Sequence, residues 1–231
     1  MKSFSACPLP PFRKSSLACL LSIAFSLSGG ARAADLAAMK ADVRHLDDGW
    51  AHVKYEVNDK DEKLKELDAL SKQADATVAR YPGEVEPLLW DGIIASEQAA
   101  VAPIIHKLGF ASTARKLFEK AEAIGGAGSD GAIAMSLGVI YYRVPGFPMG
   151  FGNVDKARRY LETALAKRPD GLDANFFYAD FLIKRGENDK ARTVLTHALG
   201  APHDPNRSVW DAGRRAEVKT LLAKIDSRSG A

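Results

Sequence analysis

The sequence is poor in groups that support covalent or redox chemistry. It contains two cysteines, Cys7 and Cys19, and both fall within the first 33 residues. From residue 34 onward there is no thiol, which excludes cysteine catalysis, cysteine-ligated metals and a disulfide framework for that part of the chain.

Long hydrophobic runs are also missing. The longest, residues 17–27, is about half of the ~20 residues that a membrane-spanning helix needs. It follows the basic residues Arg13 and Lys14 and precedes small residues that include Ala31 and Ala33. This order predicts a secretory signal peptide over residues 1–33, cleaved after Ala33.

The sequence also has little excess of charge of either sign. The whole chain has 32 basic and 29 acidic residues, but four of the basic ones and no acidic one lie in the first 33 residues. The remaining 28 against 29 are almost balanced. This balance excludes the electrostatic attraction that nucleic acids and anionic membranes require, so no nucleic-acid partner is expected.

Apolar residues from residue 34 onward recur at helical spacing, and no β-branched run suggests a strand. The pattern predicts one all-α domain over residues 34–231. Its clearest internal repeat has a period of 34 residues and is followed in each copy by a proline, Pro169 or Pro202. The repeated positions are Ala157, Leu161 and Ala164, matched by Ala191, Leu195 and Ala198.

Helix–turn–helix units of 34 residues with small residues at the crossing resemble the tetratricopeptide repeat (TPR). A third copy of the helical pattern is expected at Ala114, Phe118 and Ala121. Two further helices are predicted over residues 36–57 and 61–80, and an amphipathic helix over 208–225 would cap the end of the array. The expected fold is a TPR-like helical-hairpin solenoid of about nine helices.

Two turns of this solenoid are predicted to be longer than the repeat requires. Against the spacing from Ala179 to Ala191, seven extra residues follow Gly138 and ten follow Gly92. Equivalent turns stack along one edge of a solenoid, so the two insertions should be neighbours. Both are apolar, and they either line a pocket for an apolar ligand or a partner segment, or pack on each other and seal the helix layer.

A more specific resemblance rests on the second of these turns. Residues 137–148 read Leu-Gly-Val-Ile-Tyr-Tyr-Arg-Val-Pro-Gly-Phe-Pro, and Gly150-Phe151-Gly152 and Lys156-Ala157 follow. The stretch is similar to periplasmic helical proteins typified by the T-component of tripartite (TRAP) transporters, and similarity extends from Trp90 to Arg215. The resemblance implies a periplasmic homotrimer that helps a substrate-binding protein deliver apolar ligands to a membrane permease.

The candidate binding residues are aromatic and basic side chains in or beside the two long turns. His106 and Arg143 would fix the head of an amphipathic ligand, or alternatively bond carbonyl groups of their own loops. The full set is Trp90, His106, Phe110, Tyr141, Tyr142, Arg143, Phe147 and Phe151.

No nucleophile stands beside a base, and the only metal-like spacing, His45, Asp48 and His52, suits an exposed polar helix face better than a metal site. We therefore expect neither an enzyme nor a cofactor. The sequence favours an exported scaffold that binds a partner protein or peptide. The alternative is a TRAP-transporter-associated component that binds an apolar or amphipathic small molecule.

Overall fold

The computed structural model describes residues 18–125 and 130–229, with side chains described over residues 32–125 and 130–227. These residues form nine α-helices and a short 3-10 helix, and a single isolated bridge joins Gly146 to Gly152. The helices are α1 (Ala18–Tyr55), α2 (Lys60–Arg80), α3 (Val85–Val101), α4 (Ile104–Gly125), α5 (Ala132–Arg143), α6 (Val154–Lys167), α7 (Leu172–Lys184), α8 (Asn188–Leu199) and α9 (Ser208–Ser229), with η2 (Pro205–Arg207) before α9. The predicted all-α fold is confirmed.

Residues 1–40 and 41–231 form separate compact units. Part of the predicted signal peptide, residues 1–17, lies outside the described residues, and residues 18–33 are helical as part of α1. Within the described part of the chain, no helix combines the length and the apolar character needed to cross a membrane. Residues 41–231 contain the repeats.

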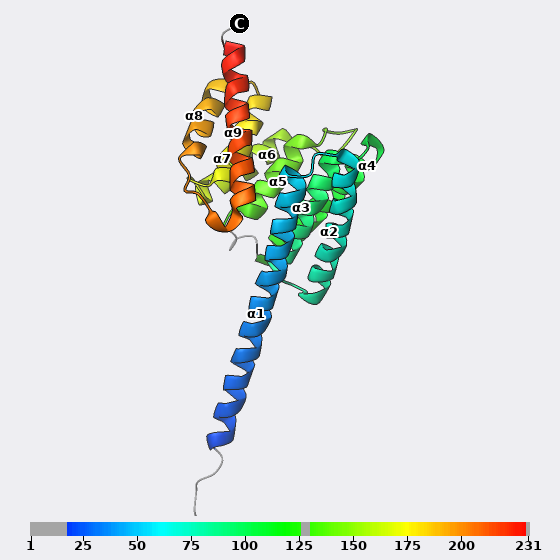
Figure 1. Ribbon diagram of the computed structural model, residues 1–231, viewed down its shortest axis with the longest axis vertical. Helices are drawn as coiled ribbons and strands as arrows, with labels where there is room; N and C mark the ends of the chain where they lie inside the picture. The colour runs from blue at the N-terminus through cyan, green and yellow to red at the C-terminus, as the bar shows by residue number, and fades with distance from the viewer. Residues whose placement is uncertain (1–17, 126–129, 230–231) are drawn as a thin grey trace, which may run out of the picture. The chain divides into compact units, whose positions relative to one another are not determined.

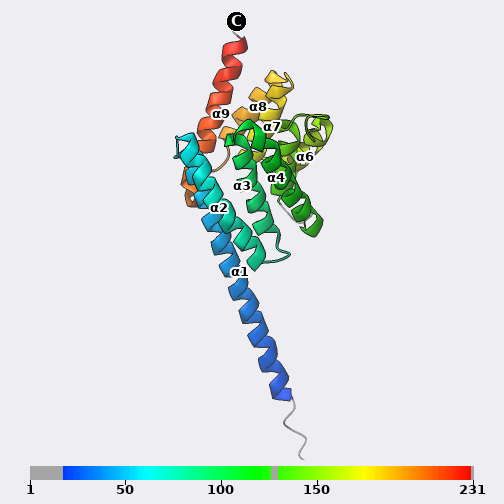
Figure 2. The ribbon, with the colours of Figure 1, turned by 90° about the vertical axis from the view of Figure 1, so that its right-hand side faces the viewer.

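Helices pack in antiparallel pairs, α3 with α4, α5 with α6 and α7 with α8 (Figures 1 and 2). Small residues at the pair crossings allow this close approach. Gly92 of α3 faces the ring of Phe118 of α4, and Gly138 of α5 faces Leu161 of α6. In both places a Cβ would come within 2.7 Å of the facing side chain. The predicted repeat of small residues is therefore the contact surface inside each hairpin.

Local signals explain where the helices begin. The Asp59 carboxylate accepts hydrogen bonds from the backbone N–H groups of Asp61 and Glu62 at the start of α2, and the Asn153 amide oxygen accepts one from Lys156 at the start of α6. Such caps satisfy N–H groups that have no partner within the helix. Gly186, with φ of 78°, makes the left-handed turn between α7 and α8 that other residues adopt only with strain.

The prediction of a ten-residue insertion in the turn after α3 is wrong. Only Ala102 and Pro103 separate α3 from α4, and the extra residues lengthen both helices to 17 and 22 residues. Proline is tolerated beside the first turn of a helix, where its missing N–H costs no hydrogen bond, so Pro103 does not force a long loop. The second insertion is a loop, between Arg143 and Val154.

Replacing Ala198 with leucine should lower the free energy of unfolding by about 1–3 kcal/mol. Ala198 is fully buried at the repeated position of α8, where three added carbons have no space. Thr196→Leu is the matched control, because Thr196 is exposed on the same helix. Urea denaturation of both variants checks the register, and equal stability of the two would contradict it.

Candidate functional site

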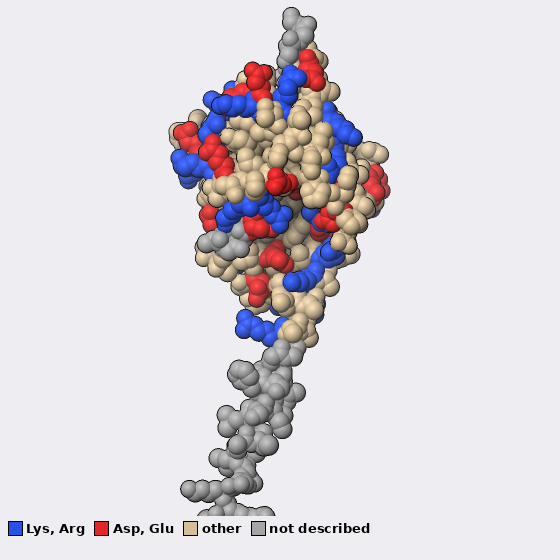
Figure 3. Space-filling model, turned by 90° about the vertical axis from the view of Figure 1, so that its left-hand side faces the viewer, with Lys and Arg blue, Asp and Glu red and all other residues tan. Residues whose placement is uncertain are grey.

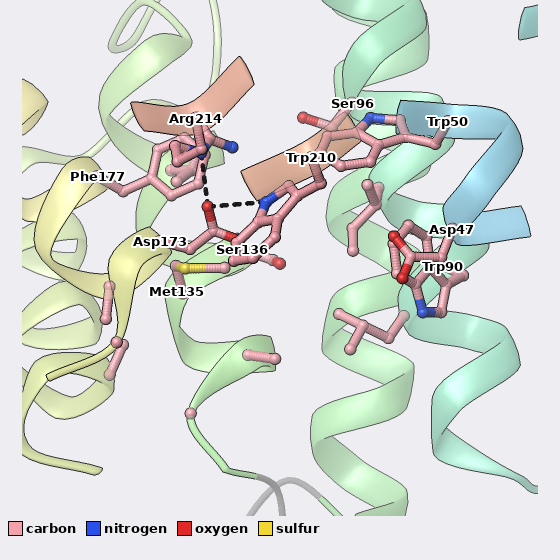
Figure 4. A pocket seen from close by; sticks show the side chains of 18 of the residues that line it. Asp47, Trp50, Trp90, Ser96, Met135, Ser136, Asp173, Phe177, Trp210 and Arg214 are labelled. Atoms are coloured by element: carbon pink, nitrogen blue, oxygen red, sulfur yellow. Dashed lines mark hydrogen bonds and ion pairs between the residues drawn. The ribbon is translucent and has the colours of Figure 1, made fainter. Parts of the chain in front are cut away.

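A pocket with a volume of about 630 Å³ lies among the helices of residues 41–231. Most of its lining comes from α1, α3, α5, α7 and α9, and Phe118 of α4, Ala164 of α6 and Arg207 of η2 also contribute. All three tryptophans of the sequence, Trp50, Trp90 and Trp210, lie in this lining (Figure 4). We call it the tryptophan pocket.

Trp50 and Trp90 meet edge to face, with ring centroids 5.9 Å apart. Trp210 reaches the pocket from α9, and its indole N–H donates a hydrogen bond of 3.3 Å to Asp173 of α7. The indole N–H of Trp50 is buried and has no hydrogen-bond partner. The pocket therefore holds one satisfied and one unsatisfied buried indole donor.

Arg214 of α9 is the most deeply buried cation in the lining, with 2% of its side chain exposed. It lies 2.6 Å from an oxygen of Asp173 and 2.6 Å from one of Glu217. Its guanidinium also covers the rings of Phe176 and Phe177, at 4.3 and 4.6 Å from their centroids. Burial alone would lower the pKa of Arg214, but the two carboxylates raise it, so the group is always charged.

A second ion pair joins α1 to α3. Lys54 Nζ lies 3.1 Å from Glu97, and both side chains are mostly buried. Burial alone would raise the pKa of Glu97, but the charge of Lys54 and the hydrogen bond from it lower that pKa. Each charge of this pair therefore makes the burial of the other tolerable.

Contacts between α1 and α9 close one side of the pocket. The guanidinium of Arg207, in η2, makes two hydrogen bonds of 2.6 and 2.7 Å to Asp47 of α1. The Tyr55 hydroxyl donates to Glu217 of α9 at 3.1 Å. Gly213 faces the Tyr55 ring so closely that a Cβ would lie 2.3 Å from a ring carbon. The first helix of residues 41–231 thus touches the last one.

Comparison with known proteins supports this description of the fold. Residues 149–225 match the tetratricopeptide repeat family model. TTC0263, a thermophilic TPR protein of Thermus thermophilus, superposes with a TM-score of 0.53 at 18% identity, covering 87% of this chain and 96% of its own. The fold is a TPR-like helical solenoid.

Two further solved structures resemble the solenoid less closely. YrrB, described as a TPR protein with an unusual peptide-binding site, has a TM-score of 0.41 at 18% identity, over 72% of this chain and 79% of its own. MamA AMB-1 has a TM-score of 0.43 at 20% identity, over 79% of this chain and 96% of its own. No curated protein sequence matches the chain.

Two of the eight residues predicted to bind a ligand, Trp90 and Arg143, line the tryptophan pocket of the TPR-like solenoid. Arg143 is already paired with Asp180 at 3.2 Å and donates to the Tyr142 hydroxyl at 3.3 Å. The guanidinium that was predicted to bind the polar head group of a ligand is therefore already paired with the carboxylate of Asp180.

The other six residues lie outside the pocket lining. Tyr141 is buried in the core and stacks on Tyr160, while Phe151 packs edge-on against Tyr141 and under the guanidinium of Arg115. Phe147 is 93% exposed at the loop tip. His106 and Phe110 lie in the first turns of α4 rather than in a loop. Neither the start of α4 nor the α5–α6 loop therefore lines this pocket, which was one of the two alternatives predicted for them: Phe151 packs onto α4, and Phe147 faces solvent.

Large exposed apolar side chains lie at the start of α4 and in the α5–α6 loop. Ile104 and Ile105, at the start of α4, are each 79% exposed, and Phe147 and Met149 of the α5–α6 loop are 93% and 73% exposed. We call these four residues the apolar edge. Exposed apolar surface of this kind is typical of an interface.

The described residues contain no group of three or more histidine, cysteine, aspartate or glutamate side chains placed to hold a metal ion. His45 pairs with Gln73 at 2.9 Å, and His52 pairs with Glu56 at 2.7 Å. Both histidines of the metal-like spacing are therefore hydrogen-bonded to other side chains.

Replacing Asp91 with asparagine should stabilise the protein at pH 8 and flatten its pH dependence. Burial, helped by the nearby charge of Asp75, raises the pKa of Asp91 from 3.8 to about 7. Since the folded state holds this proton more tightly, the stability it contributes is complete below about pH 4 and is lost as the pH rises through about 7. Urea denaturation from pH 5 to 8 should show the gain of the variant growing with pH, and a constant difference would contradict it.

Proposed function

We propose that the chain is a non-enzymatic helical-repeat scaffold that binds a protein or peptide partner in the tryptophan pocket. The observation that carries this proposal is the convergence of Trp50, Trp90 and Trp210 on one pocket. Tryptophan and arginine dominate the residues that contribute most to protein–protein binding. The TPR-like fold supports the proposal, because it offers a continuous inner surface to an extended segment.

Peptide selection tests the scaffold function. A random peptide library displayed on phage should yield an enriched motif, and the selected peptide should change the intrinsic fluorescence, because every tryptophan of the chain lies in the pocket. Trp90→Ala should weaken binding at least about tenfold. Phe147→Ala is the matched control, since it removes an exposed aromatic residue outside the pocket. No enriched motif, or equal loss in both variants, would argue against the scaffold.

A second candidate is a small-molecule-binding component that works with a substrate-binding protein of a TRAP transporter. The contact between α1 and α9 favours it, because closure on one side makes the inner surface a pocket rather than an open groove. Its volume of about 630 Å³ lies within the ~300–1,000 Å³ of small-molecule sites. An apolar adduct retained in native mass spectrometry would support this candidate, and a bare protein that captures peptide would support the scaffold.

Export and assembly complete the proposal. The predicted signal peptide supports export to the periplasm, and N-terminal sequencing of the secreted protein should begin at Ala34. The apolar edge supports a homotrimer, because four large apolar side chains remain uncovered in one copy. Native mass spectrometry should show a trimer that Phe147→Asp and Ile105→Asp disrupt, and a wild-type monomer would refute this assembly.

A further inference from the structure

We infer that the tryptophan pocket selects an uncharged small molecule with an apolar body and one hydrogen-bond acceptor, and that Trp50 Nε1 binds the acceptor. This inference rests on the small-molecule function proposed above. Three observations carry it: the pairing of charges in the lining, the unsatisfied indole N–H, and the size and closure of the pocket.

Most charges that line the pocket are already paired, and the two that have no ion-pair partner among the described residues, Arg44 and Glu86, are exposed. Five basic side chains each have a carboxylate partner, and the sixth, Arg44, donates to the carbonyl of Asn206 at 3.2 Å. The pairs are Lys54 with Glu97, Arg143 with Asp180, Arg168 with Asp130, Arg207 with Asp47 and Arg214 with Asp173. Over one face of the protein, Figure 3 likewise shows both signs interspersed.

In the buried part of the pocket, away from exposed Arg44 and Glu86, a charged ligand would have to break one of these pairs. An anion would compete with the carboxylate that holds Arg214 or Lys54, and would leave that carboxylate without a partner in a poorly hydrated place. A cation meets the same obstacle, because the lining carboxylates Asp47, Glu97, Asp130 and Asp173 are paired and Glu86 is exposed. Only an uncharged ligand enters without this penalty.

Among the three tryptophans, Trp50 has a buried indole N–H without a hydrogen-bond partner. Its side chain belongs to the buried core, with 6% of the residue exposed, and its Nε1 has no hydrogen-bond partner. Donors left in this condition destabilise a fold unless a ligand or water accepts from them. Trp50 lines the pocket beside Ser96 (Figure 4), but its Nε1 is shielded from solvent, so a ligand carbonyl or ether oxygen would satisfy it once the indole ring turns toward the pocket.

The rest of the lining suits an apolar body. Leu89, Ile93, Met135 and Phe177 supply hydrocarbon and aromatic surface around the tryptophans. The pair between Arg207 and Asp47, with the contact between Tyr55 and Glu217, links α1 to α9 on one side. This boundary favours a short molecule over a long extended chain.

Three probes with the same eight-carbon chain test the inference: methyl octanoate, octanoate and octylammonium. Binding is measured by the fluorescence of the full chain in wild type, Trp50→Phe and Trp90→Phe, with the fold of each checked by circular dichroism. We expect methyl octanoate to bind at least about tenfold more tightly than either ion. Trp50→Phe, which keeps an aromatic ring but loses the donor, should weaken the ester about three- to tenfold. Trp90→Phe, the control for loss of one indole, should weaken it less.

The possible failures are distinguishable. Equal or tighter binding of octanoate or octylammonium would overturn the selection for an uncharged ligand while leaving the small-molecule function standing. An ester affinity that Trp50→Phe leaves unchanged would overturn the role of its indole N–H. Absence of binding by all three probes would overturn both the inference and the small-molecule function.

Discussion

Replacing Arg214 with methionine should lower the free energy of unfolding by about 3 kcal/mol. The guanidinium is 2% exposed, and its removal leaves Asp173 and Glu217 without their shared cation, while the methionine retains much of the apolar contact with Phe176 and Phe177. Because both carboxylates keep some contact with water, the loss lies at the lower end of the range for broken buried ion pairs. Urea denaturation at pH 7 measures it.

Arg143→Met is the control for this change. Arg143 also lines the pocket and contacts Phe177, but 39% of its side chain is exposed and it pairs with a single carboxylate. Its loss should cost about 1 kcal/mol or less, as for partly exposed pairs. If the two variants were equally stable, the ion pairs of Arg214 with Asp173 and Glu217 would not contribute more to stability than the pair of Arg143.

Replacing Gly213 with alanine should lower the free energy of unfolding by about 1–3 kcal/mol. The added Cβ would meet the Tyr55 ring at 2.3 Å, and neither partner can retreat without separating α9 from α1. The same movement should shift the tryptophan emission, because Trp50 and Trp210 belong to the two helices that separate. Chemical denaturation and fluorescence of the native state give both readings.

Gly109→Ala supplies the opposite expectation. Gly109 lies inside α4, and nothing is within 4 Å of the position that a Cβ would take. The same substitution there should stabilise the protein by up to about 1 kcal/mol, since alanine is the better helix former. Destabilisation by both variants to the same degree would contradict the close contact at Gly213.

Much of the fold could be predicted from sequence because the signals are local. The 34-residue recurrence of small residues indicated the hairpin contacts, and Ala157, Ala191 and Ala198 are fully buried as that pattern required. The turn after α3 was mispredicted because spacing alone cannot distinguish a longer loop from longer helices. Residues 104–108 contain no turn-forming residue, and their composition was the available signal.

The pocket was harder to predict because its residues are far apart in the chain. Trp90 and Arg143 were found through motifs, but Trp50 and Trp210 are 160 residues apart and meet only because α9 returns to α1. The burial of Arg214 could not be predicted from the sequence, since arginine is usually exposed. Tryptophan was the one usable clue, because it is enriched among the residues that contribute most to binding.

The contact between α1 and α9 also bears on how the protein unfolds. In an open repeat array each unit contacts only its neighbours, so the end helices can fray without disturbing the rest. Here Asp47 and Tyr55 tie the first helix of the array to residues about 160 positions later. Loosening either end removes support from the other, so hydrogen exchange in α1 and α9 should proceed at similar rates. The array should therefore melt with the cooperativity of a closed globular domain.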